Sequence, residues 1–317
     1  MYSSLPDSPQ QVGDLIGAGI RICRRNIRLI FQKLLVPSIF TTLAGIVFQW
    51  VFTYGVSMVA ETKDIPTGIG LFFLWSAASL VFFGAWWVLG LRLLALVRMA
   101  LGFSSNYEEG WAFMNRHKWN LLGVYFLGFL IFAVAMTFLA IALMAAAMAS
   151  GAASTSPGLG VGLTIFLSFW ALILMIVVYL LGTHLSFCVL ACEEISVPAV
   201  IGRSLNLIFR HFWRALGFGC LFSLTFFIIS IPLTLPISVL TLADYFQHGL
   251  SGKEALAAAY KPPLYVLVIA QTWESIIGIV LRPMVLFCFA LFYYDLRLRS
   301  EGLDINRQLQ LLEPQST

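Results

Sequence analysis

The chain has 317 residues, of which 60% are hydrophobic and only 11% are charged, and its mean hydropathy is +0.91. This composition excludes a soluble globular protein. The formal net charge of +4 is accounted for by basic residues between apolar runs, so it does not indicate nucleic-acid binding. The sequence predicts an all-α membrane protein that forms a single membrane domain over residues 1–317.

The first predicted element is an amphipathic helix near the N-terminus. It follows an eleven-residue polar stretch that lacks the basic segment of a cleavable signal peptide. Ile16, Ile20 and Cys23 recur at helical spacing, and Ile27 and Ile30 continue this apolar stripe. The helix is expected to lie on the membrane surface with its basic face toward the lipid headgroups. The arginines of that face are Arg21, Arg24, Arg25 and Arg28.

Six apolar stretches follow, each long enough to cross the ~30 Å hydrocarbon core of a bilayer as a helix. They predict six transmembrane helices. The predicted spans are residues 34–59, 69–89, 120–148, 161–186, 215–243 and 264–287.

The positions of Lys and Arg predict the orientation of these spans. Fifteen basic residues lie in the N-terminal segment, the second and fourth connections and the tail, whereas three lie in the odd-numbered connections. Basic residues near the ends of spans remain on the cytoplasmic side of the membrane. Both termini, including a tail over residues 300–317, are therefore expected in the cytoplasm.

Two similar octets precede the third and fifth spans: RHKWNLLG at residues 116–123 and RHFWRALG at residues 210–217. Tryptophan is enriched at the headgroup level of membranes, so each octet is expected to anchor the chain at the membrane interface. The predicted anchors in the octets are Arg116, His117, Trp119, Arg210, His211 and Trp213.

The stretch before each octet also predicts an interfacial helix, which makes three such helices on the cytoplasmic side. The apolar stripe before the second octet comprises Ala199, Ile201, Leu205, Ile208 and Phe212. The polar positions expected away from this stripe are Arg203, Ser204, Arg210 and Arg214.

The spacing of these elements favours an internal repeat. The segment RRNI at residues 24–27 aligns with the two octets at offsets of 92 and 94 residues, and two spans follow each segment. This pattern predicts three units of one surface helix and two spans, over residues 12–104, 105–197 and 198–299, related by a pseudo-threefold axis along the membrane normal. The alternative is that positive-inside bias and tryptophan anchoring produce similar junctions by coincidence.

Three stretches resemble a known family: GDLIGAGIRICRRNIRLIF from residue 13, EEISVPAVIGRSLNLIFRHFWRALG from residue 193, and LFYYDLRLRSEGLDI from residue 291. They look like the bacterial integral membrane proteins grouped with the membrane domain of glycerophosphoryl diester phosphodiesterases. The resemblance implies a multi-pass protein of the bacterial inner (plasma) membrane. It implies no activity, because the stand-alone members lack the catalytic barrel and this sequence has no His-Arg-Gly stretch.

The sequence contains no recognisable catalytic constellation. His184 in the fourth span is expected to be packed rather than to act as a base, and Glu193 and Glu194 are expected to form a solvated cap before the next surface helix. No nucleophile with a base, and no metal-ligand spacing, accompanies them. The sequence therefore predicts no enzyme activity, no metal ion and no cofactor.

A candidate intramembrane polar site lies in the last two spans. Pro232 and Pro236 must free backbone carbonyls in the fifth span. Glu274 in the sixth span should face the bundle, either protonated or paired, because a charge in hydrocarbon is costly. Arg282 lies roughly 12 Å deeper and about 80° around the helix, too far to pair with Glu274 directly. The candidate site comprises Gln271, Thr272, Glu274, Arg282, Pro232 and Pro236.

These features favour a non-catalytic scaffold, lipid-interacting protein or assembly component. The expected partners are membrane lipids, including anionic lipids at the cytoplasmic face, and a protein partner that the sequence does not identify. The alternative is a transporter of a small solute or lipid that uses the polar site between the fifth and sixth spans. A cavity that reaches Glu274 would favour transport, whereas a closed bundle would favour a scaffold.

Overall fold

The computed structural model describes residues 8–62, 65–153, 157–244 and 263–302, and these form nine helices. Six helices are long and apolar enough to cross a membrane, so the described residues confirm the all-α prediction and indicate a multi-pass membrane protein. Most of the predicted tail, from residue 303 onward, lies outside the described residues. The helices are α1 (Val12–Arg25), α2 (Ile27–Thr62), α3 (Ile65–Ala100), α4 (Tyr107–Arg116), α5 (Lys118–Ala153), α6 (Pro157–Cys192), α7 (Val197–Arg210), α8 (Phe212–Asp244) and α9 (Leu264–Glu301).

The six long helices each have 33 to 38 residues and extend beyond the predicted spans. α2 begins at Ile27 rather than at residue 34, and α9 continues past residue 287 to Glu301. A hydropathy window detects only the stretch that suits hydrocarbon. The helical hydrogen bonds continue on both sides of that stretch, because charged side chains are also tolerated in a helix.

The three short helices α1, α4 and α7 are at the positions predicted for the amphipathic helices. A single non-helical residue separates each from the long helix that follows: Asn26, His117 and His211, respectively. α1 packs against α9, α4 against α3, and α7 against α5 and α6. Protein thus covers apolar surface that the sequence predicted to rest on lipid.

The amphipathic pattern predicted for α1 is confirmed. Ile16 and Cys23 are buried, whereas the arginines of the opposite face are exposed. In α7 the prediction is wrong for Ser204, which is fully buried, and for Ala199, which is exposed. The Ser204 hydroxyl can be buried because it donates to the Ile201 carbonyl at 2.9 Å and lies 2.7 Å from the Ser186 hydroxyl of α6.

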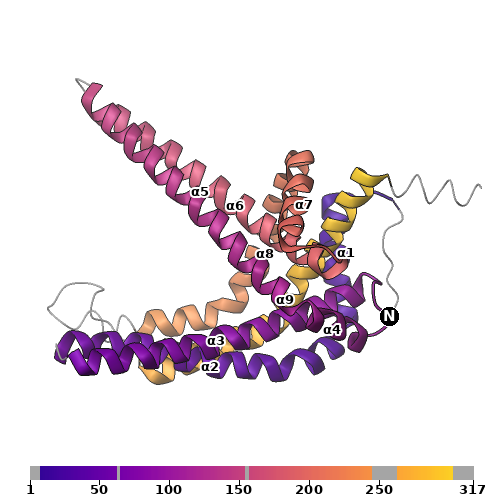
Figure 1. Ribbon diagram of the computed structural model, residues 1–317, viewed down its shortest axis with the longest axis horizontal. Coiled ribbons are helices and arrows are strands. Elements are labelled where there is room, and N and C mark those ends of the chain that lie inside the picture. The colour runs from indigo at the N-terminus through magenta and orange to yellow at the C-terminus, as the bar shows by residue number, and fades with distance from the viewer. Residues whose placement is uncertain (1–7, 63–64, 154–156, 245–262, 303–317) are drawn as a thin grey trace, which may run out of the picture.

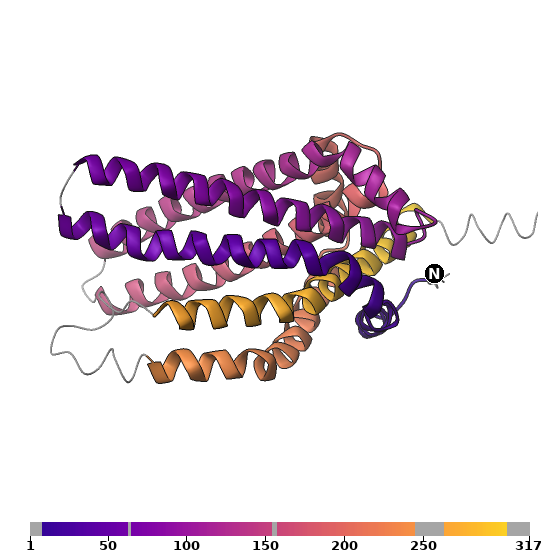
Figure 2. The ribbon, with the colours of Figure 1, turned by 90° about the horizontal axis from the view of Figure 1, so that it is seen from below.

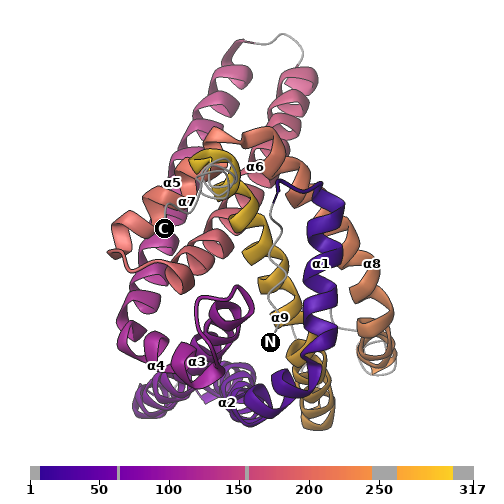
Figure 3. The ribbon, with the colours of Figure 1, turned by 90° about the vertical axis from the view of Figure 1, so that its right-hand side faces the viewer.

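The long helices form two groups that converge at one end (Figure 1). α2, α3, α8 and α9 run alongside one another, as Figure 2 shows from below, whereas the α5 and α6 pair diverges from them. The short helices surround the converging end, which Figure 3 shows end-on, and we call this the short-helix end.

The core lies at the short-helix end, around the second half of α9. Phe292, Tyr293 and Leu296 are fully buried there, and the Phe292 ring stacks on Phe218 of α8 with centroids 4.0 Å apart. Almost none of the apolar residues in the spans of α5 and α8 are fully buried, and many of them are exposed. Exposed apolar helix surface of this kind suits contact with lipid.

Candidate functional site

The second half of α9 carries charged residues on two faces. Asp295 and Arg299 are four residues apart and share one face, whereas Tyr293, Arg297 and Glu301 recur at the same spacing on a second face. The offset of two residues turns the second face by roughly 200° around the helix. Each face pairs with a different set of neighbouring helices.

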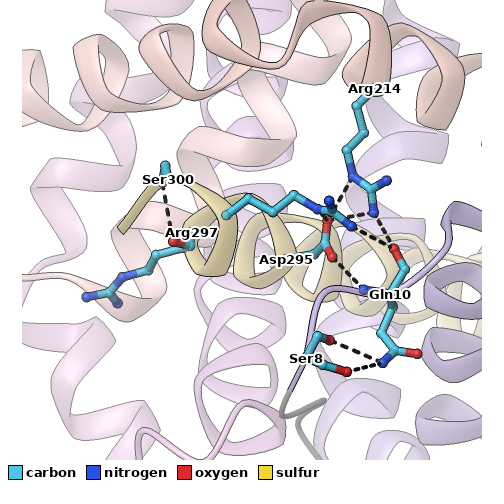
Figure 4. Close-up of polar contacts among 7 residues, drawn as sticks. Ser8, Gln10, Arg214, Asp295, Arg297 and Ser300 are labelled. Carbon is cyan, nitrogen blue, oxygen red and sulfur yellow. Dashed lines mark hydrogen bonds and ion pairs between the residues drawn. The ribbon is translucent and has the colours of Figure 1, made fainter. Parts of the chain in front are cut away.

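The first face centres on Asp295, a fully buried carboxylate at the short-helix end (Figure 4). Its Oδ2 accepts hydrogen bonds from the Arg214 Nε at 2.9 Å and from the Arg299 Nε at 3.1 Å, and its Oδ1 accepts one from the Gln10 backbone N–H at 2.9 Å. Both arginines also donate to the Gln10 carbonyl. We call these four residues the Asp295 hub; they join the segment before α1, the start of α8 and the end of α9.

The second face meets Glu193, at the end of α6. The Tyr293 hydroxyl donates to the Glu193 carboxylate, and the Arg203 Nε of α7 lies 2.8 Å from the same carboxylate. Arg203 and Arg297 also pair with Glu301. We call these five residues the Glu193 network. Burial alone would lower the pKa of Arg203, but the charges of Glu193 and Glu301 raise it, so the guanidinium remains charged.

The prediction of a solvated acidic cap is therefore wrong for Glu193. Its side chain is 14% exposed and holds three helices together, whereas the adjacent Glu194 is exposed. The signal that sequence reasoning missed is the four-residue spacing of Tyr293, Arg297 and Glu301, which marks one helix face that needs charged partners.

Several basic residues of the α3–α4 region also have partners. The Arg98 Nη1 donates to the Ala191 carbonyl of α6 at 2.7 Å, and its guanidinium lies 3.5 Å from the centroid of the Phe113 ring. The Arg92 Nη1 donates to the Lys33 carbonyl at 3.1 Å. These residues fasten α3 to its neighbours, so they serve packing as well as charge distribution.

The tryptophans and arginines among the predicted interfacial anchors are instead exposed. Trp119 is 64% exposed and Trp213 is 81% exposed. Four exposed arginines on α1 and at the start of α2 make no hydrogen bond or ion pair within the part of the chain that the structure describes. We call them the basic patch. Its residues are Arg21, Arg24, Arg25 and Arg28.

The histidines of the two octets mark the breaks before α5 and α8. The His117 Nδ1 lies 3.0 Å from the Phe113 carbonyl, in the preceding turn. Burial, together with the positive charges of Arg210, Arg299 and Arg214, lowers the pKa of His211. Arg116 and Arg210, next to these histidines, are exposed.

The predicted polar site in the last two spans is arranged differently from the expectation. The Trp273 indole of α9 donates to the Leu233 carbonyl of α8 at 2.7 Å, in the segment that contains Pro232 and Pro236. Glu274, predicted to face the bundle, is exposed, and it makes no hydrogen bond to the described residues of α8. Trp273, not Glu274, therefore links the two helices here. Thr272 is exposed as well.

Gln271 lies in a polar seam between α9 and α2, not between α9 and α8. Its Nε2 donates to the Gln49 Oε1 at 2.7 Å. One turn further along α9, Ser275 pairs with the hydroxyl of Thr42 and donates to the carbonyl of Ser38 at 3.4 Å. Small and hydroxyl-bearing side chains at four-residue spacing allow close helix contact and hydrogen bonds across it. The sequence signal that was missed is the four-residue spacing of Ser38 and Thr42 in α2.

A cavity of about 370 Å³ lies where the α5 and α6 pair meets α3 and α9; we call it the vertex cavity. Its lining is mostly apolar but includes Arg282 of α9 and Thr183 and His184 of α6. The His184 ring stacks on Phe289 at 4.6 Å, and its Nδ1 lies 2.8 Å from the Leu180 carbonyl. His184 is thus held by packing, as the sequence predicts.

Comparisons with protein-family models, with curated proteins and with solved structures found no match. The resemblance to the phosphodiesterase membrane domains therefore stays a prediction. Among the described residues, no group of three or more His, Cys, Asp or Glu side chains is placed to hold a metal ion. The functional conclusion therefore depends on the distribution of charge and apolar surface in this fold.

Proposed function

We propose that this chain is a non-catalytic protein of the bacterial inner membrane that interacts with anionic lipids at the cytoplasmic face. The basic patch carries the proposal. Four other arginines at the short-helix end, Arg203, Arg214, Arg297 and Arg299, are held in ion pairs by the Asp295 hub and the Glu193 network, whereas the arginines of the patch are exposed. Each juxtamembrane arginine gains about 1 kcal/mol from an anionic membrane surface.

The proposal places the short-helix end, and both termini, in the cytoplasm. The basic residues of the hub, the network and the patch all lie at that end. Because basic residues near span ends remain on the cytoplasmic side, this grouping supports the orientation. Trp119 and Trp213, exposed near the starts of α5 and α8, would then lie at the cytoplasmic headgroup level.

The three-repeat architecture remains part of the proposal. In its favour, each short helix precedes a one-residue break and two long helices. The break falls on the second residue of both octets, at His117 and His211. In the first unit it falls on Asn26, one position later than the alignment of the segments predicts.

A scaffold role accords with the way the short helices are fastened. The Asp295 hub and the Glu193 network tie the chain before α1, the end of α6, and α7 and α8 to a single helix, α9. Such a surface can present lipid or a protein partner with a fixed set of exposed groups. The alternative, a transporter with its site between α8 and α9, stays a prediction; the vertex cavity is lined by α3, α5, α6 and α9, and Glu274 is not among its lining residues.

The basic patch can be tested by changing all four of its arginines to glutamine. The wild-type protein, extracted in copolymer nanodiscs from membranes of mixed lipids, should retain an excess of phosphatidylglycerol over phosphatidylethanolamine relative to the bulk membrane. Lipid mass spectrometry should find this excess reduced in the glutamine variant and retained in a variant with four lysines, because the lysines keep the charge. Equal lipid ratios for all three proteins would refute the proposal.

A further inference from the structure

The vertex cavity combines an apolar lining with one cationic group. Leu89 and Leu93 of α3 and Leu121 of α5 contribute to the apolar walls, and Arg282 projects from α9. Its volume of about 370 Å³ is within the range of small-molecule sites in proteins, roughly 300 to 1,000 Å³. The α5 and α6 pair diverges from α2, α3 and α9 away from the short-helix end (Figure 1).

Arg282 is half-buried and has no partner among the residues that the structure describes. A Cβ atom on Gly278 would lie 3.1 Å from the Arg282 Cζ, so the absence of a side chain at Gly278 leaves room for the guanidinium against α9. Within the described residues the guanidinium makes no hydrogen bond or ion pair, and the Glu274 carboxylate, two turns away, acts on it only at longer range. A charge within a membrane span normally has a partner, because its desolvation is costly.

The depth of the cavity suits a lipid headgroup. Tyr125 of the lining lies six residues beyond the exposed Trp119 in α5, which is about 9 Å along the helix. His184 lies eight residues before the end of α6 at Cys192, which is about 12 Å. The guanidinium therefore lies a short distance below the interface at the short-helix end, where local thinning of the bilayer can bring a phosphate down to a buried arginine.

We propose that the vertex cavity binds one anionic membrane lipid, whose phosphate pairs with the Arg282 guanidinium and whose acyl chains lie along the apolar walls. This inference rests on the proposed lipid-interacting function and assigns it a second, specific site. A planar guanidinium can donate two parallel hydrogen bonds to a phosphate. The leucine-rich lining favours a lipid over a soluble anion, because a soluble anion would gain nothing from apolar walls.

His184 lines the same cavity, but its neutral ring offers no donor to a phosphate. Its Nδ1–H donates to the Leu180 carbonyl, which leaves Nε2 as the free ring nitrogen. Stacking on Phe289 fixes the plane of the ring. The free Nε2 can only accept a hydrogen bond, so Arg282 is the residue that pairs with the phosphate.

Four variants test this assignment. Arg282→Gln removes the charge and keeps the cavity, whereas Arg282→Lys keeps a charge. Gly90→Leu fills the cavity and keeps the arginine, since a Cβ at Gly90 meets only the Leu121 and Tyr125 side chains, at 3.6 and 3.8 Å. Gly128→Leu is the matched control, because Gly128 lines a different groove, between α5, α6 and α7, where a Cβ meets nothing within 4 Å.

Native mass spectrometry of the full chain in mild detergent, titrated with phosphatidylglycerol, should count one tightly bound lipid per wild-type chain. Arg282→Gln and Gly90→Leu should weaken that binding by about tenfold or more, whereas Arg282→Lys and Gly128→Leu should retain most of it. Phosphatidylcholine, which has the same chains but no net charge, should bind about tenfold more weakly than phosphatidylglycerol. Helical circular dichroism and gel filtration report whether each variant is folded, and the comparison of phosphatidylglycerol with phosphatidylcholine on the wild type tests the charge if Arg282→Gln is misfolded.

Equal affinity of the wild type and folded Arg282→Gln, or of the two lipids, would overturn the site. Inorganic phosphate is the probe for a soluble anion. If phosphate alone displaces the bound phosphatidylglycerol from the wild type, the cavity would be assigned to a soluble anion and the lipid assignment would be overturned. The variant with all four patch arginines changed to glutamine separates this result from the proposed function. It should lower the excess of phosphatidylglycerol around the protein and still bind the single tight lipid. The cavity variants should lose the tight lipid and keep the excess of phosphatidylglycerol.

Discussion

The Arg214 guanidinium of α8 holds the carboxylate of Asp295 in α9, with an Nη2–Oδ2 distance of 2.8 Å, and Asp295 is fully buried. The two residues are 81 positions apart in sequence. Around them, the Gln10 backbone and Arg299 complete a set of charge-assisted hydrogen bonds (Figure 4). This pair fixes the start of the fifth span against the last helix.

Asp295→Asn should destabilise the protein strongly. The change leaves two arginine side chains at the short-helix end without their carboxylate, and breaking a buried ion pair from one side costs about 3 kcal/mol or more. Detergent-denaturation curves should show the loss. A double-mutant cycle with Arg214→Ala should give a coupling energy of at least about 1 kcal/mol.

Glu108→Gln is the matched control for this experiment. Glu108 also pairs with a basic residue, Lys33, at 2.6 Å, but its side chain is 70% exposed. Glu108→Gln should therefore lower the free energy of unfolding much less than Asp295→Asn does. Similar costs for the two variants would show that the buried hub contributes no special stability.

The stability of the protein should depend on pH through His211. Burial and the charges of Arg210, Arg299 and Arg214 lower its pKa, so the folded protein binds this proton less readily than the unfolded chain, where imidazole titrates near about pH 6.5. Neutral His211 therefore contributes stability above that pH, and the contribution is lost as the pH falls through the lower folded pKa. The denaturant concentration at the midpoint of unfolding should decrease as the pH is lowered from about 7 to about 5. His211→Gln should make this decrease smaller. An unchanged slope in the variant would exclude His211 as its source.

Trp119→Ala and Trp213→Ala should both lower the yield of folded protein, with the larger effect at Trp119. Trp119 packs against Trp87, with ring centroids 5.5 Å apart, and the Trp87 indole donates to the Lys118 carbonyl. Trp213 is more exposed and contacts mainly its neighbour Phe212. In membranes, quenching by lipids brominated near the headgroup should decrease in each variant. Quenching that is unaffected by either change would show that these tryptophans do not lie at the interface.

Trp273→Phe should destabilise the contact between α8 and α9 by about 1 kcal/mol, because it removes the donor to the Leu233 carbonyl and keeps the aromatic ring. Glu274→Gln is the control in the next position of the helix; its side chain is exposed, so folding should be little changed. A transport assay across a pH gradient adds a second readout. Loss of pH-dependent uptake in a folded Glu274→Gln protein would support the transporter alternative instead of the scaffold.

Cysteine labelling checks the orientation. Of the five cysteines, only Cys220 is exposed, so a Cys220→Ala background leaves four buried thiols with low reactivity. Cysteines introduced at Ser105 and Ser300, which lie at the short-helix end, should react with a membrane-impermeant maleimide only after cell lysis. Cysteines at Ser154 and Ser251, outside the described residues, should react in intact spheroplasts. Labelling of Ser105→Cys in intact spheroplasts would invert the topology.

The sequence by itself determined the all-α class, the six spans and the three short helices. Hydrophobic length and the helical period are local properties, and a bilayer requires each span to satisfy its own backbone hydrogen bonds. The stripe that contains Ile16 and Cys23 was readable for the same reason. The helix ends could not be predicted from the sequence, because the helices extend several residues beyond the apolar stretch that the hydropathy detects. Examples are the start of α2 at Ile27 and the end of α9 at Glu301.

Only the tertiary structure decided which polar groups meet. Glu193 has the sequence context of a solvated cap, yet it is held by Tyr293 and Arg203 from two other helices. Gln271 pairs with Gln49, 222 residues away, and Arg282 lines a cavity to which four helices contribute. Periodicity specifies the face of a helix on which a side chain lies. The neighbour that this face meets depends on how all the helices pack together, and a local stretch of sequence does not specify that packing.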